Sequence, residues 1–265
     1  MRCAVLGDPI AHSLSPALHR AGYAAVGLDW TFGAHRVAAG GLSAFVRSLD
    51  ASWRGLSLTM PLKREAVELA SGVSPVARLA GAANTLLLVD GAPHADNTDV
   101  PGAIAALRAR YGGPLTGATI LGGGATAAST ALALCELGVR SITLLVRSPA
   151  RAAETLAAID RHASRPAVTV GSLAHDPVVG DVVVSTLPQA AQTAELVDRC
   201  AAVPVVFDVV YDPWPTPLSA SAGDRVLVTG LDLLLHQAAL QFEMFTGLGA
   251  PVEAMRAAGE AALAS

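Results

Sequence analysis

Short apolar segments alternate along the first third of the chain with Ala-rich segments whose polar positions recur at helical spacing. The apolar segments predict strands at 3–6, 30–35 and 55–58. The segments between them predict helices at 16–26 and 41–49. Strands that alternate with helices in this way are typical of an α/β fold, in which crossover helices join parallel strands.

Three local signals refine this pattern. Ser15 precedes a proline and is predicted to cap the helix that follows. Thr59 is placed to cap a further helix at 61–70. Asp90 and Gly91 lie between an apolar strand and a second extended segment, and this dipeptide predicts a two-residue hairpin turn.

A second α/β run begins at residue 119, after a helix predicted at 100–111. Its predicted strands are 119–121, 141–146, 168–170, 182–185, 205–209 and 226–229, and its predicted helices are 125–137, 150–162 and 189–201. Two more helices are predicted at 231–246 and 251–264. We therefore expect two α/β domains, one formed by 1–101 with 232–265 and one by 102–231.

Composition excludes several classes of protein. The net charge is −4 and the pI is about 5.9, so no basic surface for nucleic acid is expected. Mean hydropathy is +0.47, but no apolar run reaches the roughly 18 residues of a membrane-spanning helix. Three isolated cysteines argue against a disulfide framework or a metal site. We expect buried reduced thiols, a cytoplasmic location and no membrane partner.

The basic residues are distributed unusually, because 17 of the 18 are arginine and only Lys63 is lysine. Arginine stays protonated at any working pH, whereas lysine can lose its proton when its surroundings lower its pKa. A lysine that survives in such a chain is a candidate for proton transfer.

A glycine-rich loop follows the strand at 119–121 and opens the next helix. Its residues are Gly122, Gly123, Gly124, Ala125, Thr126 and Ala127. They fit Gly-x-Gly-x-x-Gly/Ala, in which the glycines allow a tight turn and a close approach to a pyrophosphate at the helix N-terminus. A plain tight turn is the alternative interpretation of three glycines in a chain this rich in small residues.

The segment after the second strand of this unit indicates which dinucleotide binds. An NAD site normally carries an acidic residue there to hold the ribose 2′-hydroxyl. Residues 139–153 contain none, and Arg147, Ser148 and Arg151 lie there instead. Guanidinium groups suit a 2′-phosphate, so NADP is the predicted cofactor. Two solvated arginines at a helix start are the alternative.

Hydroxyl, amide and charged side chains gather after the strands of the first unit, where open α/β sheets bind ligands. They include Ser13 and Ser15, then Ser57, Thr59 and Lys63, then Asn84 and Thr85, and finally Asp96, Asn97, Thr98 and Asp99. Such a set suits a small, hydroxyl-rich, anionic molecule.

At these residues the chain resembles the shikimate dehydrogenases. The resemblance spans nearly the whole chain and rests on His12-Ser-Leu-Ser-Pro16, Thr59-Met-Pro-Leu-Lys63, Gly81-Ala-Ala-Asn-Thr85, Asn97-Thr-Asp99, the Gly122 loop, Asp208-Val-Val-Tyr-Asp-Pro213 with Thr216-Pro217-Leu218, and Gly230 through Gln237. It implies an N-terminal α/β substrate domain and a Rossmann-type NADP domain, with the active site in the cleft between them. It also implies the reversible NADPH-dependent reduction of 3-dehydroshikimate to shikimate, a step of aromatic amino-acid biosynthesis.

The resemblance also implies a role for each matching residue. Ser13 and Ser15 would hold the ring carboxylate, and Tyr211 would line the site. Ring hydroxyls would be held by Thr59, Asn84, Asp99 and Gln237. The cofactor would be bound by Gly122, Gly123, Gly124, Ala125, Thr126, Arg147, Ser148, Arg151, Thr186, Leu187, Val209 and Gly230. Lys63 and Asp99 would form the catalytic pair.

The chemistry of that pair follows from elementary principles. Hydride addition to a ketone builds negative charge on its oxygen, which a nearby ammonium stabilises and can protonate. A carboxylate beside the ammonium orients it and favours its charged form, whereas burial has the opposite effect. The sequence does not decide which effect dominates at Lys63.

The chain departs from the family pattern at several positions, among them Ser57 and Gln189, where the family usually has Asn and Gly. Ser57 is therefore expected to shorten a substrate contact or route it through water. Alternatives also stay open: an NAD-dependent quinate/shikimate dehydrogenase, a paralogue that acts on aminoshikimate, and a non-catalytic NADP-binding sensor. The sequence leaves open a homodimer.

Overall fold

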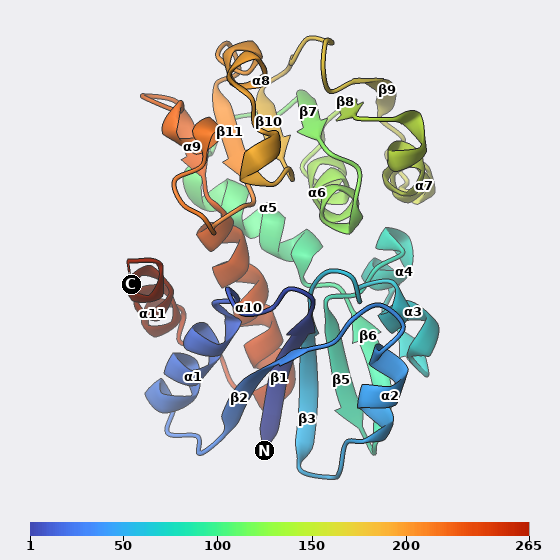
Figure 1. Ribbon diagram of the computed structural model, residues 1–265, viewed down its shortest axis with the longest axis vertical. Coiled ribbons are helices and arrows are strands. Elements are labelled where there is room, and N and C mark those ends of the chain that lie inside the picture. Colours follow the sequence, from blue (N-terminus) through green and yellow to red (C-terminus); the bar gives the residue numbers. More distant parts are fainter. Residues whose placement is uncertain (265) are drawn as a thin grey trace. The chain divides into compact units, whose positions relative to one another are not determined.

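The structure, a computed structural model, describes residues 1–264 and contains two compact units (Figure 1). The first unit comprises Met1–Thr98 and the chain from Leu234 onward, and the second comprises Asp99–Leu233. Each unit is built on one six-stranded sheet. The predicted α/β class and the two-unit organisation are confirmed, whereas the assignment of a ligand to each unit stays a prediction.

The sheet of the first unit has the strand order β2-β1-β3-β5-β6-β4. Its strands are β1 (Arg2–Gly7), β2 (Thr31–Arg36), β3 (Trp53–Leu58), β4 (Gly72–Val73), β5 (Thr85–Val89) and β6 (Ala92–Asp96). Strands β1, β2 and β3 are parallel, and β5 runs antiparallel to β3 and β6. The helices of this unit are α1 (Ser15–Ala25), α2 (Leu42–Arg47), α3 (Glu65–Leu69), α4 (Pro75–Ala80), α11 (Val252–Leu263) and most of α10 (Gly230–Thr246).

Side chains of β1 alternate between two hydrophobic cores because successive residues of a strand point to opposite faces. Cys3 and Val5 pack with α1, α10 and α11 on one face of the sheet (Figure 1). Ala4 and Leu6 pack with α2, α3 and α4 on the other. Apolar side chains on both faces keep the central strands buried.

Two predicted helix starts in this unit are wrong. Ser15 is itself the first residue of α1, and the cap position is Leu14, which offers no side-chain hydrogen bond. The helix predicted at 61–70 is confined to α3, whose cap position is Arg64 and not Thr59. The carbonyl of Lys63 accepts a hydrogen bond of 2.7 Å from the amide of Ala83, so it is not available to a helical turn.

The sequence prediction also missed α4, although its signals are present. Ser74 accepts a hydrogen bond of 3.1 Å from the amide of Ala77, a proline follows it, and Gly81 closes the helix with φ of 64°. The hairpin prediction is confirmed, since Asp90 and Gly91 both have positive φ, 50° and 79°, between β5 and β6.

The sheet of the second unit is parallel throughout, in the order β12-β11-β10-β7-β8-β9. Its strands are β7 (Gly117–Leu121), β8 (Ser141–Val146), β9 (Ala167–Ser172), β10 (Val182–Ser185), β11 (Val205–Asp208) and β12 (Val226–Val228). Its helices are α5 (Asp99–Arg110), α6 (Ala125–Glu136), α7 (Ala153–Arg161), α8 (Ala194–Arg199) and α9 (Pro217–Ala220), with 3₁₀ turns η1 (Pro149–Ala152) and η2 (Gln189–Ala191). This is the strand order of dinucleotide-binding folds, in which the chain reverses direction across the sheet beside its first strand, here β7.

The three cysteines are free and buried, as predicted. Cys3 lies in the core of the first unit, and Cys200 packs against the sheet of the second. Burial raises the pKa of both thiols to about 11, so they stay protonated at neutral pH. No helix within residues 1–264 is long and apolar enough to cross a membrane.

Candidate functional site

The strand pairing of the first unit brings its polar segments to one edge of the sheet. Leu6 near the end of β1 pairs with Leu58, the last residue of β3. Thr85, which begins β5, pairs with Ser57 on one side and with Asp96, the last residue of β6, on the other. The loops after β1, β3 and β6 and the start of β5 therefore meet at this edge.

The loops after β1 and β3 are held together by their backbones. The amide of Thr59 donates to the carbonyl of Leu6 at 2.9 Å, and the amide of Asp8 donates to the carbonyl of Met60 at 2.9 Å. A Cβ on Gly7 would lie 2.3 Å from the Thr59 methyl carbon, so this approach requires glycine. The contact fixes the half-buried Thr59 beside the loop that carries Ser13.

Ser13 and Ser15 are placed as neighbours in the loop before α1. The amide of Ser15 donates to the Ser13 hydroxyl oxygen at 3.4 Å, a long bond. Ser13 is half-buried and Ser15 is buried. Their proposed contact with a carboxylate stays a prediction.

Asn84 is the centre of a buried polar cluster in this unit, and its side chain is 2% exposed. Its Oδ1 accepts from the Thr85 hydroxyl at 2.9 Å and from the amide of Thr98 at 2.8 Å. Its Nδ2 donates to the Thr98 hydroxyl at 2.8 Å and to Oε1 of Gln237 at 3.0 Å. The structure thus brings Asn84 and Gln237 together, two residues that the family resemblance assigns to ring hydroxyls.

The sequence prediction missed Gln241 and gave Ser57 a different role. Gln241 lies one turn after Gln237 on α10, and the Ser57 hydroxyl donates to its Oε1 at 2.6 Å. Ser57 thus donates within the protein, and its expected contact with the substrate, shortened or through water, stays a prediction. The four-residue spacing of the two glutamines was the available signal, because it places both on one face of a helix.

Lys63 and Asp99 occupy different units. Lys63 is half-buried in the loop after β3. Asp99 is buried and is the first residue of α5, where the helix dipole favours a carboxylate. Catalysis by this pair therefore stays a prediction.

The glycine loop of the second unit has the shape of a phosphate cradle. Gly122 has φ of 110°, and a Cβ there would lie 2.3 Å from the Thr186 hydroxyl oxygen. A Cβ on Gly123 would lie 2.1 Å from the carbonyl oxygen of Arg151. Gly124 precedes α6 in an extended conformation, and no atom lies within 4 Å of where its Cβ would be.

No side chain within residues 1–264 caps α6, so its first amides can bind an anion. Ala125 and Thr126 begin this helix and are half-buried. Thr186 reinforces the loop from β10, because its amide and its hydroxyl both donate to the carbonyl of Leu121 at 3.0 Å. Leu187 beside it is buried.

Arg147, Ser148 and Arg151 lie together at the end of β8 and in η1, all exposed. Across residues 1–264 neither guanidinium group has a hydrogen-bonding or ionic partner. The contact between Gly123 and the Arg151 backbone joins this basic segment to the glycine loop. An anion bound at the loop would therefore have cationic groups near it.

The segments after β11 and β12 also approach each other closely. A Cβ on Gly230 would lie 2.5 Å from the carbonyl oxygen of Val209. Tyr211 is half-buried in the same segment as Val209. This contact brings together two residues that the sequence assigns to the cofactor, Val209 and Gly230.

A buried carboxylate, which sequence reasoning did not single out, organises the loop after β10. Asp208 at the end of β11 accepts hydrogen bonds from the Thr216 hydroxyl, from Nε2 of Gln192 at 3.0 Å and from the amide of Val210 at 3.3 Å. Burial raises the pKa of Asp208, and these donors oppose the rise. Gln192 in turn accepts from the amide of Leu218 at 3.0 Å, which ties the loop containing Gln189 to α9.

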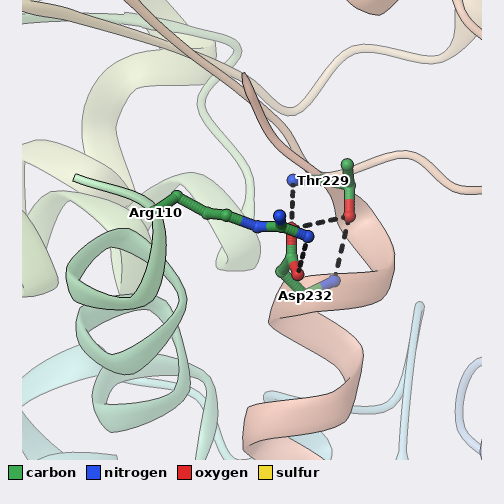
Figure 2. A network of polar contacts seen from close by, with 3 residues as sticks. All are labelled: Arg110, Thr229 and Asp232. Atoms are coloured by element: carbon green, nitrogen blue, oxygen red, sulfur yellow. Dashed lines mark hydrogen bonds and ion pairs between the residues drawn. The ribbon is translucent and has the colours of Figure 1, made fainter. Parts of the chain in front are cut away.

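Asp232 fixes the start of α10 (Figure 2). It accepts from the amide and hydroxyl of Thr229 at 3.0 and 2.9 Å, while its own amide donates to the Thr229 hydroxyl oxygen at 3.1 Å. Arg110 in the last turn of α5 adds a two-pronged ion pair at 3.1 and 2.9 Å. Burial alone would raise the pKa of Asp232, but Arg110 and Thr229 outweigh it and the pKa is lowered. Gly230 lies between Thr229 and Asp232 in the chain and is held in place by this network.

Comparison with known proteins connects both units to one enzyme family. Residues 5–86 match the family model described as shikimate dehydrogenase substrate binding domain, and residues 230–258 match the shikimate 5′-dehydrogenase C-terminal domain. The NADP-dependent shikimate dehydrogenase of Moorella thermoacetica is 36% identical, across 95% of this chain and 90% of that protein.

Two solved structures match nearly the whole chain. The crystal structure of Mycobacterium tuberculosis shikimate dehydrogenase has a TM-score of 0.89 and 40% identity, and the match covers 98% of this chain and 99% of that one. The Thermus thermophilus shikimate 5-dehydrogenase in complex with NADP(H) and shikimate has a TM-score of 0.83 and 31% identity, with 99% of each chain covered.

Proposed function

The chain belongs to the shikimate dehydrogenase family, and on that premise we propose that it catalyses the reversible NADPH-dependent reduction of 3-dehydroshikimate to shikimate. The observation that carries the proposal is the buried cluster of amide and hydroxyl groups around Asn84, which a hydroxyl-rich ring requires. Relatives named as shikimate dehydrogenases support the substrate, and the complex of one of them with NADP(H) supports the cofactor. The reaction belongs to aromatic amino-acid biosynthesis.

The second unit fits NADP. The close approach that requires Gly123, the uncapped start of α6 and the two arginines without protein partners within residues 1–264 suit a pyrophosphate and a separate phosphate group. The glycine loop would hold the pyrophosphate, and Arg147, Ser148 and Arg151 would hold the 2′-phosphate. NADPH, when bound, supplies the hydride.

The remaining cofactor contacts come from the loops after β10, β11 and β12. Thr186, Leu187, Val209 and Gly230 would contact the cofactor. Hydrogen bonds to Asp208 and Asp232 hold these loops in place. Neither carboxylate needs to contact the cofactor to do so.

Most of the proposed substrate contacts come from the first unit. The hydroxyls of Ser13 and Ser15 would hold the ring carboxylate, and Tyr211 of the second unit would line the site. The ring hydroxyls would be held by Thr59, Asn84, Asp99 and Gln237. A ring whose hydroxyls match the fixed donors and acceptors around Asn84 would be favoured over a ring that lacks them.

Lys63 and Asp99 would carry the proton chemistry. The Nζ ammonium of Lys63 would stabilise the negative charge that develops on the carbonyl oxygen and then donate a proton to it. In the oxidative direction the neutral amine would accept that proton from the hydroxyl. The Asp99 carboxylate would orient the ammonium group.

A matrix of steady-state assays tests the proposal. Shikimate, quinate and aminoshikimate are each combined with NADP or NAD, and absorbance of the reduced nicotinamide is followed. We expect turnover to be fastest with shikimate and NADP. Faster turnover with NAD would overturn the assignment of the arginines to a 2′-phosphate, and no turnover in any combination would leave a non-catalytic NADP-binding protein.

Substitutions then test the individual roles. Replacing Arg147 and Arg151 by leucine should raise the KM for NADP about tenfold or more and leave the KM for NAD nearly unchanged. Lys63→Met should abolish turnover and keep shikimate affinity. Lys63→Arg keeps the charge without the titration and should also be nearly inactive, so near-normal activity in that variant would contradict proton transfer by Lys63.

A further inference from the structure

Gln241 is a deeply buried amide near the Asn84 cluster, with 1% of its surface exposed. Its Nε2 donates to the backbone carbonyl of Asn84 at 3.0 Å and to the Thr85 hydroxyl oxygen at 2.9 Å. Its Oε1 accepts from the Ser57 hydroxyl at 2.6 Å. Both ends of this amide are thus assigned, because a flip would set its Oε1 against the backbone carbonyl oxygen of Asn84, which can only accept.

Thr85 transmits the fixed orientation of the Gln241 amide to the side chain of Asn84. A threonine hydroxyl has one hydrogen, and because its oxygen already accepts from Gln241, the hydrogen is free to go to Oδ1 of Asn84, 2.9 Å away. The amide of Thr98 donates to the same oxygen. Two donors therefore hold Oδ1 of Asn84 on this side.

The orientation of Asn84 then decides that of Gln237. With Oδ1 held, Nδ2 of Asn84 must face the other way, where it donates to Oε1 of Gln237 at 3.0 Å. Nε2 of Gln237 donates to the carbonyl of Leu234 at 2.9 Å, which agrees with this assignment. Each group therefore donates to the next in one direction, from Ser57 through Gln241, Thr85 and Asn84 to Gln237.

We propose that Gln241 and Thr85 are positioning residues that fix which face of the Asn84 and Gln237 amides donates and which accepts. This rests on the proposed function, in which those two amides hold ring hydroxyls. A hydroxyl is recognised by the placement of donors and acceptors around it, so an amide free to flip would present the wrong group in part of the molecules. Gln241 and Thr85 act only through their neighbours.

Thr85→Val and Thr85→Ser form a matched pair that tests this. Valine has the shape of threonine but no hydroxyl, so Asn84 loses one of the two donors to its Oδ1 and Gln241 loses an acceptor. We expect the KM for shikimate to rise about 10- to 100-fold and the KM for NADP to stay within about twofold. Serine keeps the hydroxyl, so Thr85→Ser should restore the KM for shikimate. A purely structural role would lower the active fraction, and hence kcat, and leave this KM unchanged.

Gln241→Glu adds a test that depends on pH, because the new carboxyl group can be protonated or ionised. The new carboxylate can still accept from Ser57 but cannot donate to Thr85, whose hydrogen would turn toward it and away from Asn84. We expect a raised KM for shikimate at pH 8 that falls toward the wild-type value as the carboxyl becomes protonated at lower pH. A wild-type KM for Thr85→Val, a failure of Thr85→Ser to restore it, or a pH-independent defect in Gln241→Glu would each overturn the proposal.

A binding-independent measurement separates this proposal from the proposed function. Hydrogen exchange of the Asn84 side-chain NH₂ group, followed by NMR, should be slow in the wild type and faster in Thr85→Val. If the wild type did not turn over shikimate, the proposed function would fail, while slow exchange that Thr85→Val accelerates would still support the fixed orientation. Equal exchange in the two proteins would overturn it.

Discussion

Arg110→Met removes one partner of the ion pair at the start of α10 and keeps most of the aliphatic stem. The Asp232 side chain is 3% exposed, whereas that of Arg110 is 47% exposed. Breaking a fully buried pair costs about 3–5 kcal/mol, and exposed pairs contribute about 0.2–1 kcal/mol. Because Thr229 still donates twice to the carboxylate, we expect a loss of about 2 kcal/mol of unfolding free energy.

Asp232→Asn is the second single variant of a double-mutant cycle, alongside Arg110→Met. Its amide oxygen can still accept from Thr229, and the half-exposed Arg110 can be hydrated, so we expect a smaller loss of about 1 kcal/mol. The two substitutions remove the same interaction. The double variant should therefore be more stable than additivity predicts, by about 1 kcal/mol.

Urea unfolding of the four proteins between pH 6 and 8 measures these quantities, with shifted midpoints and unchanged slopes expected. The lowered pKa of Asp232 fixes the pH dependence. Its contribution is fully present above the unfolded-state pKa of about 3.9 and is lost as pH falls through the lower folded-state pKa. A cost below about 0.5 kcal/mol for Arg110→Met at pH 7, or strict additivity in the cycle, would refute the reasoning.

Three further substitutions follow from the packing. Gly123→Ala places a methyl group against the Arg151 backbone and should lower the unfolding free energy by about 1–3 kcal/mol or more. Gly124→Ala meets open space and should leave the stability unchanged. Thermal melts compare the two variants, and equal stability would contradict the close approach at Gly123. Burial lowers the pKa of His19 to about 3, so stability should fall by up to about 1.4 kcal/mol per unit as pH drops below about 6.5, and His19→Phe should remove that slope in urea titrations. Asp208 is surrounded by donors alone, so Asp208→Asn should cost about 1–3 kcal/mol of unfolding free energy; a wild-type urea midpoint would show that its amide finds an acceptor.

The features that the sequence predicted well depend on residues close together in the chain. The order of strands and helices follows from apolar spacing, which is periodic over a few residues. The turn at Asp90 and Gly91 is local because both residues tolerate positive φ. The glycine loop was recognisable because its strand, turn and helix are consecutive. Lys63 stood out because its chemistry differs from that of the arginines around the rest of the chain.

The features that sequence reasoning missed depend on partners far away in the chain. Gln241 donates to Thr85, 156 positions earlier, and accepts from Ser57, 184 positions earlier. Gln192 is fixed by Asp208, 16 positions later, and the two meet because β10 and β11 are neighbours. Nothing in the residues adjacent to either glutamine indicates such a partner.

The helix predicted at 61–70 shows how a local sequence pattern and a tertiary hydrogen bond compete. Its apolar spacing is helical, but the carbonyl of Lys63 bonds to Ala83 instead of to the next turn. Each backbone carbonyl seeks a donor, and the sheet order decides which donor is near. The sequence by itself therefore determined most of the elements, the glycine loop and the choice of Lys63 as a candidate for proton transfer. Only the tertiary structure decided which buried polar groups became partners, because hydrogen bonds between distant segments form only once the strands are in place.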